Sequence, residues 1–202
     1  MQNNKRLTAL DLTIGSIFIA LMTVGANITS IAPFMVIGGV PITLQTFFAI
    51  LTGLILGSRL GAISMLVYML LGLAGAPIFA QFKGGASTLI SPTFGFIVSF
   101  IVIAYVAGKL IEKKQSFSMY ITAALIAMVI NYLLGANWMY AAYMFWFDAP
   151  EGFSYQLVWY WLAVPLPKDI VLSIGAGIFA HRLEKSFISK SMFRNQHNQN
   201  AA

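Results

Sequence analysis

A lysine and an aspartate stand side by side in one of the most apolar stretches of the chain, the segment LPKDIV at 166–171. The stretch YQLVWYWLAVP precedes this segment and LSIGAGIFA follows it, so both charges lie in a run that otherwise suits lipid. A charged side chain inside a membrane span costs about 2.5–3.5 kcal/mol on insertion scales and usually faces a cavity or a bundle interior. We therefore expect Lys168 and Asp169 to form the polar pole of a solute-binding site.

A purely local explanation of the two charges stays open. Pro165 and Pro167 break a helix, and Asp169 would then fall in the first turn of a new helical segment, where a carboxylate suits the helix dipole. Lys168 could neutralise it, although adjacent residues on a helix do not face each other, so a direct ion pair would need irregular backbone.

The elements around this pair are predicted to be membrane-spanning helices. Of the 202 residues, 59% are hydrophobic and 9% are charged, whereas a soluble domain carries about 25% charged residues. A spanning helix needs roughly 20 apolar residues, and runs such as AALIAMVI lack the alternation of a β-barrel strand. We predict an all-α integral membrane protein, a single six-helix domain over 1–185 and a polar, disordered tail over 186–202. The helices are expected near 9–29, 42–57, 60–80, 92–111, 119–140 and 157–181.

The positive charge of the chain is explained by membrane topology. Of the 12 Lys and Arg residues, Lys168 lies within a span and Lys83 in an outer loop, and the other ten fall on one side if the N-terminus is cytoplasmic. This bias is typical of cytoplasmic loops, so we expect both termini in the cytoplasm of a multi-pass plasma-membrane protein. A nucleic-acid partner is disfavoured. The N-terminal apolar stretch exceeds the core of a signal peptide, so we retain it as the first helix.

Motifs for enzymatic chemistry are missing from the sequence. The chain has no cysteine, no GxxxxGK[ST] phosphate loop and no HExxH pair, and its six acidic residues have no metal-ligand spacing. We expect no metal, no cofactor and no catalytic residue. A binding or transport subunit is favoured over a membrane enzyme.

Further polar groups gather on the outer side of the predicted bundle. GGVPITLQTF at 38–47 leads into the second helix with Gln45, and FKGGASTLISPTFG at 82–95 forms a glycine- and hydroxyl-rich loop. NYLLGANWMYAAY at 131–143 is expected to interrupt the fifth helix. Tyr132 suits either a ligand site or an interfacial aromatic belt, and a belt is preferred for Trp146, Trp159 and Trp161.

The first helix carries small residues at a spacing of four, Ser16 and Ala20. Such spacing lets another helix approach closely, and internal packing would explain it equally well.

Four motifs together resemble the BioY family. These are GGVPITLQTFFAILTGLILGSRLGAISMLVYMLLGLAGAPIFA at 38–80, GGASTLISPTFGF at 84–96, Y-x-x-G-x-x-W at 132–138 and P-x-D at 167–169. BioY is the biotin-specific substrate-capture (S) component of energy-coupling-factor (ECF) transporters, and the resemblance covers residues 9–183. It implies a six-helix bundle that binds biotin near the outer face, gated by the loops after helices one and three. It also implies that small residues such as Ser16 and Ala20 dock a transmembrane coupling subunit, which carries two cytoplasmic ATPases.

The sequence departs from the family at the charged segment described first. The family motif resembles P-G-D-x-x-K, but here a lysine occupies the glycine position and Leu172 the lysine position. A lysine stem could carry the Lys168 ammonium about one helical turn, 5–6 Å, toward the vacated place, and Lys83 is the competing cation. The candidate substrate-binding residues are Leu44, Gln45, Tyr68, Lys83, Gly84, Gly85, Tyr132, Lys168 and Asp169.

The resemblance implies a subunit that binds biotin and delivers it across the membrane, energised in trans by the ECF coupling module. Two alternatives are the same fold binding another small vitamin-like carboxylate and, less favoured, a membrane enzyme.

Overall fold

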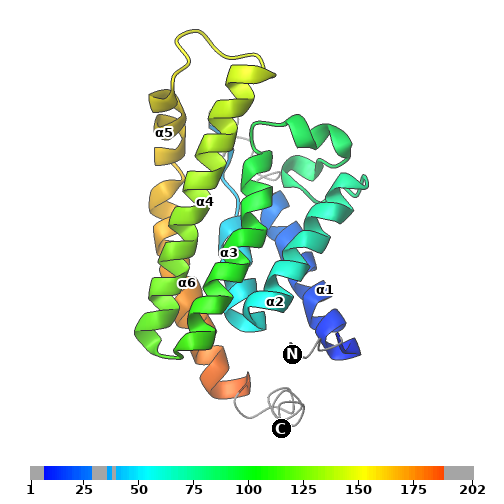
Figure 1. The fold of residues 1–202 in the computed structure, drawn as a ribbon, viewed down its shortest axis with the longest axis vertical. Coiled ribbons are helices and arrows are strands. Elements are labelled where there is room, and N and C mark those ends of the chain that lie inside the picture. The colour runs from blue at the N-terminus through cyan, green and yellow to red at the C-terminus, as the bar shows by residue number, and fades with distance from the viewer. Residues whose placement is uncertain (1–6, 29–35, 38–39, 189–202) are drawn as a thin grey trace, which may run out of the picture.

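The structure is a computed structural model that describes residues 7–28, 36–37 and 40–188. Its described part is a bundle of helices (Figure 1), and the expected all-α class is confirmed. Two strands of two residues each, β1 (Val36–Ile37) and β2 (Val40–Pro41), pair antiparallel between the first two helices. Most of the tail expected over 186–202 lies outside the described residues.

Helix α1 (Ala9–Asn27) begins at a capping box. The Thr8 hydroxyl accepts from the Asp11 backbone N–H, and the Asp11 carboxylate accepts from the Thr8 N–H. These bonds satisfy backbone donors that a helix start leaves without partners, and they fix the beginning of the first expected span. α1 then packs mainly against α2.

Helix α2 (Gln45–Leu73) contains two antiparallel passes. Gly57 has φ 79° and ψ 177°, a non-helical conformation that reverses the chain. The Gln45 and Tyr68 side chains, 23 residues apart, are hydrogen-bonded at 3.0 Å, although a continuous helix would separate them by about 34 Å. The two spans expected over 42–57 and 60–80 are therefore confirmed, with the second ending at Leu73.

The turn at Gly57 is closed by helix α3 (Phe94–Lys113). The Glu112 carboxylate accepts from the Ser58 backbone N–H at 2.8 Å and from its hydroxyl at 2.7 Å. A carboxylate in this position caps the restarted helix. Gly108 packs so closely that a Cβ there would lie 2.2 Å from the Ser58 nitrogen.

Helix α4 (Phe117–Phe145) runs without a break through the stretch that was expected to interrupt it. That expectation is wrong because the polar residues of this stretch bond within the bundle and leave the helical backbone intact. Asn131 contacts Ser99 and Thr46, and the Asn137 amide donates to the Leu133 carbonyl one turn earlier.

The last span is broken in two. Helix α5 (Tyr155–Ala163) and helix α6 (Leu166–Leu183) meet at an angle of 58°, where Pro165 and Pro167 disfavour a continuous helix. α6 continues into a short π-helical turn, η5 (Glu184–Ile188). By length and composition α1, α2, α3 and α4 can each cross a membrane, as can the bent pair α5–α6 together. Because α2 reverses at Gly57, its two arms count as two helices, and the bundle then has the six helices expected from the sequence.

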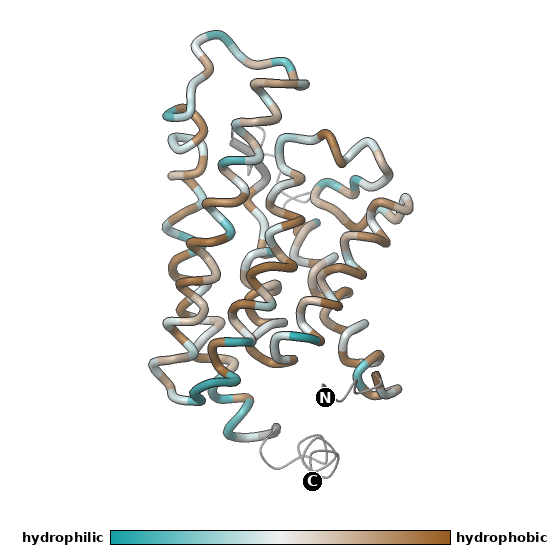
Figure 2. The backbone as a smooth tube through the Cα atoms, viewed as in Figure 1, coloured by the Kyte–Doolittle hydropathy of each residue, from teal (hydrophilic) through white to brown (hydrophobic). Residues whose placement is uncertain are grey.

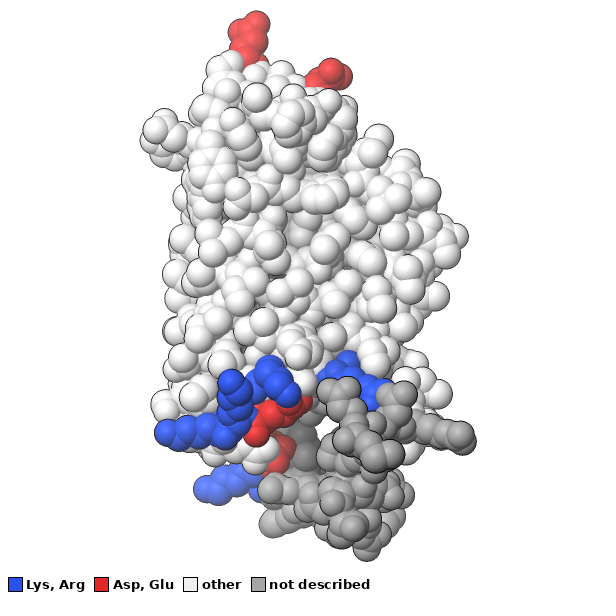
Figure 3. Space-filling view, in the orientation of Figure 1, with Lys and Arg blue, Asp and Glu red and all other residues white. Residues whose placement is uncertain are grey.

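The two ends of the bundle differ in charge. Figure 2 shows hydrophobic residues along most of the helix length and hydrophilic residues gathered toward the ends. In Figure 3 the blue Lys and Arg side chains form a band at the end where α1 begins and α6 ends, with some acidic side chains among them, whereas the charged side chains seen at the opposite end are acidic. This arrangement agrees with the bias predicted from the sequence.

Candidate substrate-binding site

A cavity of about 280 Å³ lies in the half of the bundle away from the basic band. Its walls come from the start of α2, the loop over 74–93, the start of α3, the middle of α4 and the break between α5 and α6. This loop holds two 3-10 turns, η3 (Ala80–Phe82) and η4 (Ala86–Ile90). The volume is near the lower end of small-molecule sites, roughly 300–1,000 Å³. Its apolar wall is largely aromatic, with Phe79, Phe94, Phe96, Phe100, Tyr143 and Phe147.

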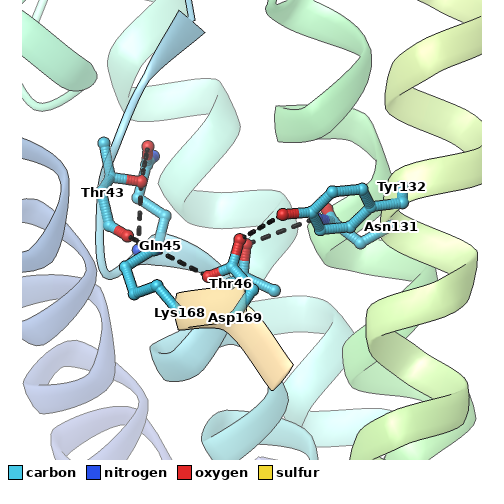
Figure 4. Close-up of polar contacts among 7 residues, drawn as sticks. All are labelled: Thr43, Gln45, Thr46, Asn131, Tyr132, Lys168 and Asp169. Atoms are coloured by element: carbon cyan, nitrogen blue, oxygen red, sulfur yellow. Dashed lines mark hydrogen bonds and ion pairs between the residues drawn. The ribbon is translucent and has the colours of Figure 1, made fainter. Parts of the chain in front are cut away.

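Lys168 and Asp169 form a direct ion pair on the wall of this cavity (Figure 4). Lys168 Nζ lies 2.6 Å from Asp169 Oδ1 and also donates to the Thr43 carbonyl oxygen. Tyr132 donates its hydroxyl hydrogen to the other carboxylate oxygen, Oδ2, at 2.7 Å. Asp169 is 5% exposed. A buried carboxylate is tolerated when it is paired and hydrogen-bonded, and here both of its oxygens have partners.

The pair forms on regular helical backbone, because Lys168 and Asp169 both lie in the first turn of α6 and the flexible lysine side chain reaches the neighbouring carboxylate. The expectation that a direct pair needs irregular backbone is therefore wrong. Asp169 lies in the first turn of α6, as the local explanation expected, and its backbone N–H donates to the Pro165 carbonyl at 3.0 Å. The same turn faces the cavity, so the local explanation is compatible with a solute site there, which stays a prediction. Leu172 does not line the cavity.

A second cluster of polar side chains lies beside the cluster of Lys168, Asp169 and Tyr132, and the sequence indicated only part of it. The Asn131 amide donates to the Thr46 hydroxyl at 3.3 Å, and the buried Ser99 hydroxyl donates to Asn131 Oδ1 at 2.6 Å. Asn131 and Thr46 both line the cavity, yet neither was among the candidate residues. The available signal was the position of Asn131 next to Tyr132 in an otherwise apolar run.

Five of the nine candidate substrate-binding residues line the cavity: Gln45, Lys83, Tyr132, Lys168 and Asp169. The other four lie in or behind its walls. Leu44 is the residue before α2, and its N–H donates to the Gly25 carbonyl. Tyr68 is fully buried and bonds Gln45 from behind.

The two glycines of the loop have structural roles near the cavity. A Cβ on Gly84 would lie 2.3 Å from the Ala76 carbonyl oxygen, so only glycine fits there. Gly85, the residue before η4, has φ 94°, a conformation that residues other than glycine rarely adopt. The binding roles of all nine residues remain predictions.

Trp138 and Trp146 anchor a loop, and the interfacial belt expected for Trp146, Trp159 and Trp161 stays a prediction. Trp138 Nε1 donates to the Ser91 carbonyl at 3.0 Å, and Trp146 Nε1 donates to the Ile90 carbonyl at 2.7 Å. Both bonds tie the loop over 74–93 to α4. Trp159 and Trp161 are half-buried and contact Tyr155 and Phe153, respectively.

Ser16 and Ala20 lie on the outside of α1, away from the cavity. Ile17 and Val24 on the same helix are 52% and 62% exposed. The Ser16 hydroxyl donates to the Leu12 carbonyl at 2.8 Å, so this face leaves no hydroxyl hydrogen without an acceptor. Because Ser16 and Ala20 are exposed, internal packing does not explain why these two residues are small, and docking of a partner stays a prediction.

Comparisons with known proteins agree with this geometry. The sequence model described as the BioY family matches residues 1–189. The chain is 39% identical over 195 residues to the putative biotin transporter BioYB of Bacillus subtilis (strain 168), and this match covers 96% of each protein. It is 34% identical over 102 residues to the probable biotin transporter BioY of Lysinibacillus sphaericus, and this match spans 50% of the chain and 52% of that relative.

The fold also has a solved counterpart. The crystal structure of the S-component for biotin from an ECF-type ABC transporter matches with a TM-score of 0.72 at 21% identity, covering 92% of this chain and 95% of that one. At this identity the match shows the fold, and the family model over almost the whole chain shows the lineage. The chain belongs to the BioY family.

Proposed function

We propose that this chain binds biotin in the cavity between α2, α3, α4 and α6 and delivers it across a bacterial plasma membrane as the S component of an ECF transporter. The observation that carries the proposal is a cavity of the right chemistry in a BioY-family fold. Its wall combines an aromatic apolar surface with the paired charges of Lys168 and Asp169. Few precisely placed polar groups in a mostly apolar pocket are typical of small-molecule sites.

Each part of biotin finds a chemical match in the cavity wall. The ureido ring needs acceptors for its N–H groups and donors for its oxygen, and Asp169, Asn131 and Thr46 offer both within one cluster. The apolar ring and tail suit the phenylalanine-rich wall. The carboxylate needs a cation, and both Lys83 and Lys168 line the cavity.

Energy for transport would come from the partners. The relatives are described as biotin transporters, and the solved counterpart as a component of an ECF-type ABC transporter. We infer that the exposed face of α1 around Ser16 and Ala20 docks a transmembrane coupling subunit, which in turn carries two ATPases. The basic band would then face the cytoplasm together with both termini.

Uptake of labelled biotin by proteoliposomes tests this proposal. Vesicles holding the chain with a coupling module and ATP should accumulate biotin, and vesicles holding the chain alone should bind it without ATP-dependent accumulation. Absence of biotin uptake with the complete module, despite folded protein, would contradict the proposal. Uptake of a different small carboxylate in that assay would favour the alternative ligand, which the departure at Leu172 keeps open.

A further inference from the structure

The turn from Ile78 to Lys83 has a backbone that its residues do not favour. Gln81 and Phe82 have φ values of 63° and 54°, so two successive residues other than glycine are left-handed. Such a residue is strained and persists only where the surroundings hold it. Strain of this kind clusters at ligand clamps, and this turn places Gln81 and Lys83 on the cavity wall.

Two side chains from distant elements hold the turn in place. Asn27, at the end of α1, accepts from the Phe82 backbone N–H at 2.6 Å and reaches the Ile78 carbonyl with its amide nitrogen at 3.5 Å. Tyr68, from α2, donates to the same Ile78 carbonyl at 2.9 Å. Asn27 is 7% exposed and Tyr68 is 0% exposed. Both anchoring side chains are thus buried, and the turn depends on both helices.

The hydrogen bonds that hold the turn continue through Tyr68 to the polar wall of the cavity. Gln45 donates to the Tyr68 hydroxyl at 3.0 Å, and the Thr43 hydroxyl donates to Gln45 Oε1 at 3.2 Å. Tyr68 therefore connects a residue that lines the cavity with the turn that carries Lys83. Neither Tyr68 nor Asn27 lines the cavity itself.

The two lysines of the cavity differ in what they already bind. Lys168 donates to Asp169 and to the Thr43 carbonyl, so two of its three hydrogens are engaged. Among the residues that the structure describes, the Lys83 ammonium has no acceptor, and the side chain is exposed at the cavity mouth. Lys83 is thus the cation that a ligand carboxylate reaches without displacing a partner.

We propose that Asn27 and Tyr68 are positioning residues that hold the Ile78–Lys83 turn so that Lys83 meets the carboxylate of the bound ligand. This rests on the proposed function, because it assigns the carboxylate end of biotin to the turn and leaves the ureido end to the Asp169 cluster. A structural role alone would weaken all ligands equally. A positioning role weakens only ligands that carry the carboxylate.

A double-mutant cycle on the full-length protein tests the proposal, with biotin and biotinamide titrated into each variant. Lys83→Ala should raise the dissociation constant of biotin about 10-fold, a loss at the lower end of the range for hydrogen bonds to charged groups. It should raise the dissociation constant of biotinamide by less than about twofold. Asn27→Ala should show the same selectivity, and adding it to Lys83→Ala should cause little further loss. Residues that act through one another are non-additive in such a cycle.

Two further variants keep the outcome clear. Tyr68→Phe removes only the hydroxyl and replaces Asn27→Ala in the cycle if that variant fails to fold. Phe82→Gly relieves the left-handed strain and should recover part of the biotin affinity lost in Asn27→Ala. Tyr132→Phe, which acts on Asp169 instead of the turn, should be additive with Lys83→Ala.

Losses that multiply between Asn27→Ala and Lys83→Ala, or that affect biotin and biotinamide alike, would overturn this inference alone. Wild-type protein that binds neither ligand would overturn the proposed function and this inference with it.

Discussion

At the scale of single residues, the Lys168–Asp169 pair carries the cost of placing charge inside an apolar bundle. Lys168 Nζ and Asp169 Oδ1 are 2.6 Å apart, and the Lys168 and Asp169 side chains are 28% and 7% exposed, respectively. Removing one member of a buried pair leaves a charge without compensation, which costs more than the pair itself contributes. The pair is therefore expected to be coupled in stability as well as in binding.

Lys168→Met should lower the free energy of unfolding by about 1–3 kcal/mol, a value reduced from that of a fully buried pair because Lys168 is partly exposed. Adding Asp169→Asn should recover most of that stability, since no uncompensated charge remains, without recovering biotin binding. Thermal unfolding in detergent measures both variants. A double variant less stable than Lys168→Met would contradict the pairing.

Residue type indicated only part of this site. Lys168, Asp169 and Tyr132 stand out because charged or phenolic groups are rare in a span. Asn131 and Thr46 do not, because small polar residues in spans often bond only to their own helix. Thr52 and Ser64 do so here, donating to the carbonyls of Phe48 and Leu60. Tertiary packing decides which hydroxyls and amides reach the cavity.

At the scale of elements, the reversal inside α2 determines where the site forms. It folds the chain back at Gly57, so that Gln45 and Tyr68 meet and the loop over 74–93 returns to the cavity. The charge-free run before Arg59 indicated a span, but the end of the next span was predicted seven residues too late. Gly75, with φ 108°, and Pro77 interrupt that apolar run, and hydrophobicity alone did not reveal the stop.

Gly57→Ala should destabilise the protein by about 1–2 kcal/mol, because a Cβ disfavours the left-handed backbone of the turn. Gly175→Ala is the matched control. Gly175 lies within α6, and a Cβ there meets nothing within 4 Å, so helix propensity should make this change neutral or stabilising by up to about 1 kcal/mol. Equal effects of the two changes on the unfolding temperature would argue against a strained turn.

The outer face of α1 gives a second test at this scale. Ser16→Leu and Ala20→Leu should reduce ATP-driven uptake while leaving biotin affinity within about twofold, because both residues are exposed and remote from the cavity. Thr122→Leu, on the exposed side of α4, is the control and should leave both measurements unchanged. Equal loss of binding and uptake in the α1 variants would show that this face maintains the fold.

At the scale of the whole molecule, the distribution of charge orients the bundle. Lys109 and Lys113 at the end of α3 belong to the basic band, whereas Asp148 and Glu151 lie in the loop between α4 and α5 at the opposite end. Excess Lys and Arg mark cytoplasmic segments. We therefore predict that the cavity, in the half away from the band, faces the outside of the cell.

Reporters of membrane sidedness check this orientation. A tag inserted at residue 150 should be accessible from outside the cell, and one at residue 113 only from the cytoplasm, if both termini are cytoplasmic. Cytoplasmic accessibility at residue 150 would contradict the orientation. It would also place the cavity on the wrong side for capture of an external solute.

The most direct test of the central claim is calorimetric titration of biotin into the purified protein, with desthiobiotin and lipoate as competitors. We predict saturable binding of one biotin per chain, strong competition by desthiobiotin, which keeps the ureido group, and weak competition by lipoate, which keeps only a carboxylate tail. Asp169→Asn should abolish most of this affinity, and Asp148→Asn, in an exposed loop, should retain it. Folded wild-type protein that releases no heat with biotin, or that binds lipoate as tightly as biotin, would contradict the account.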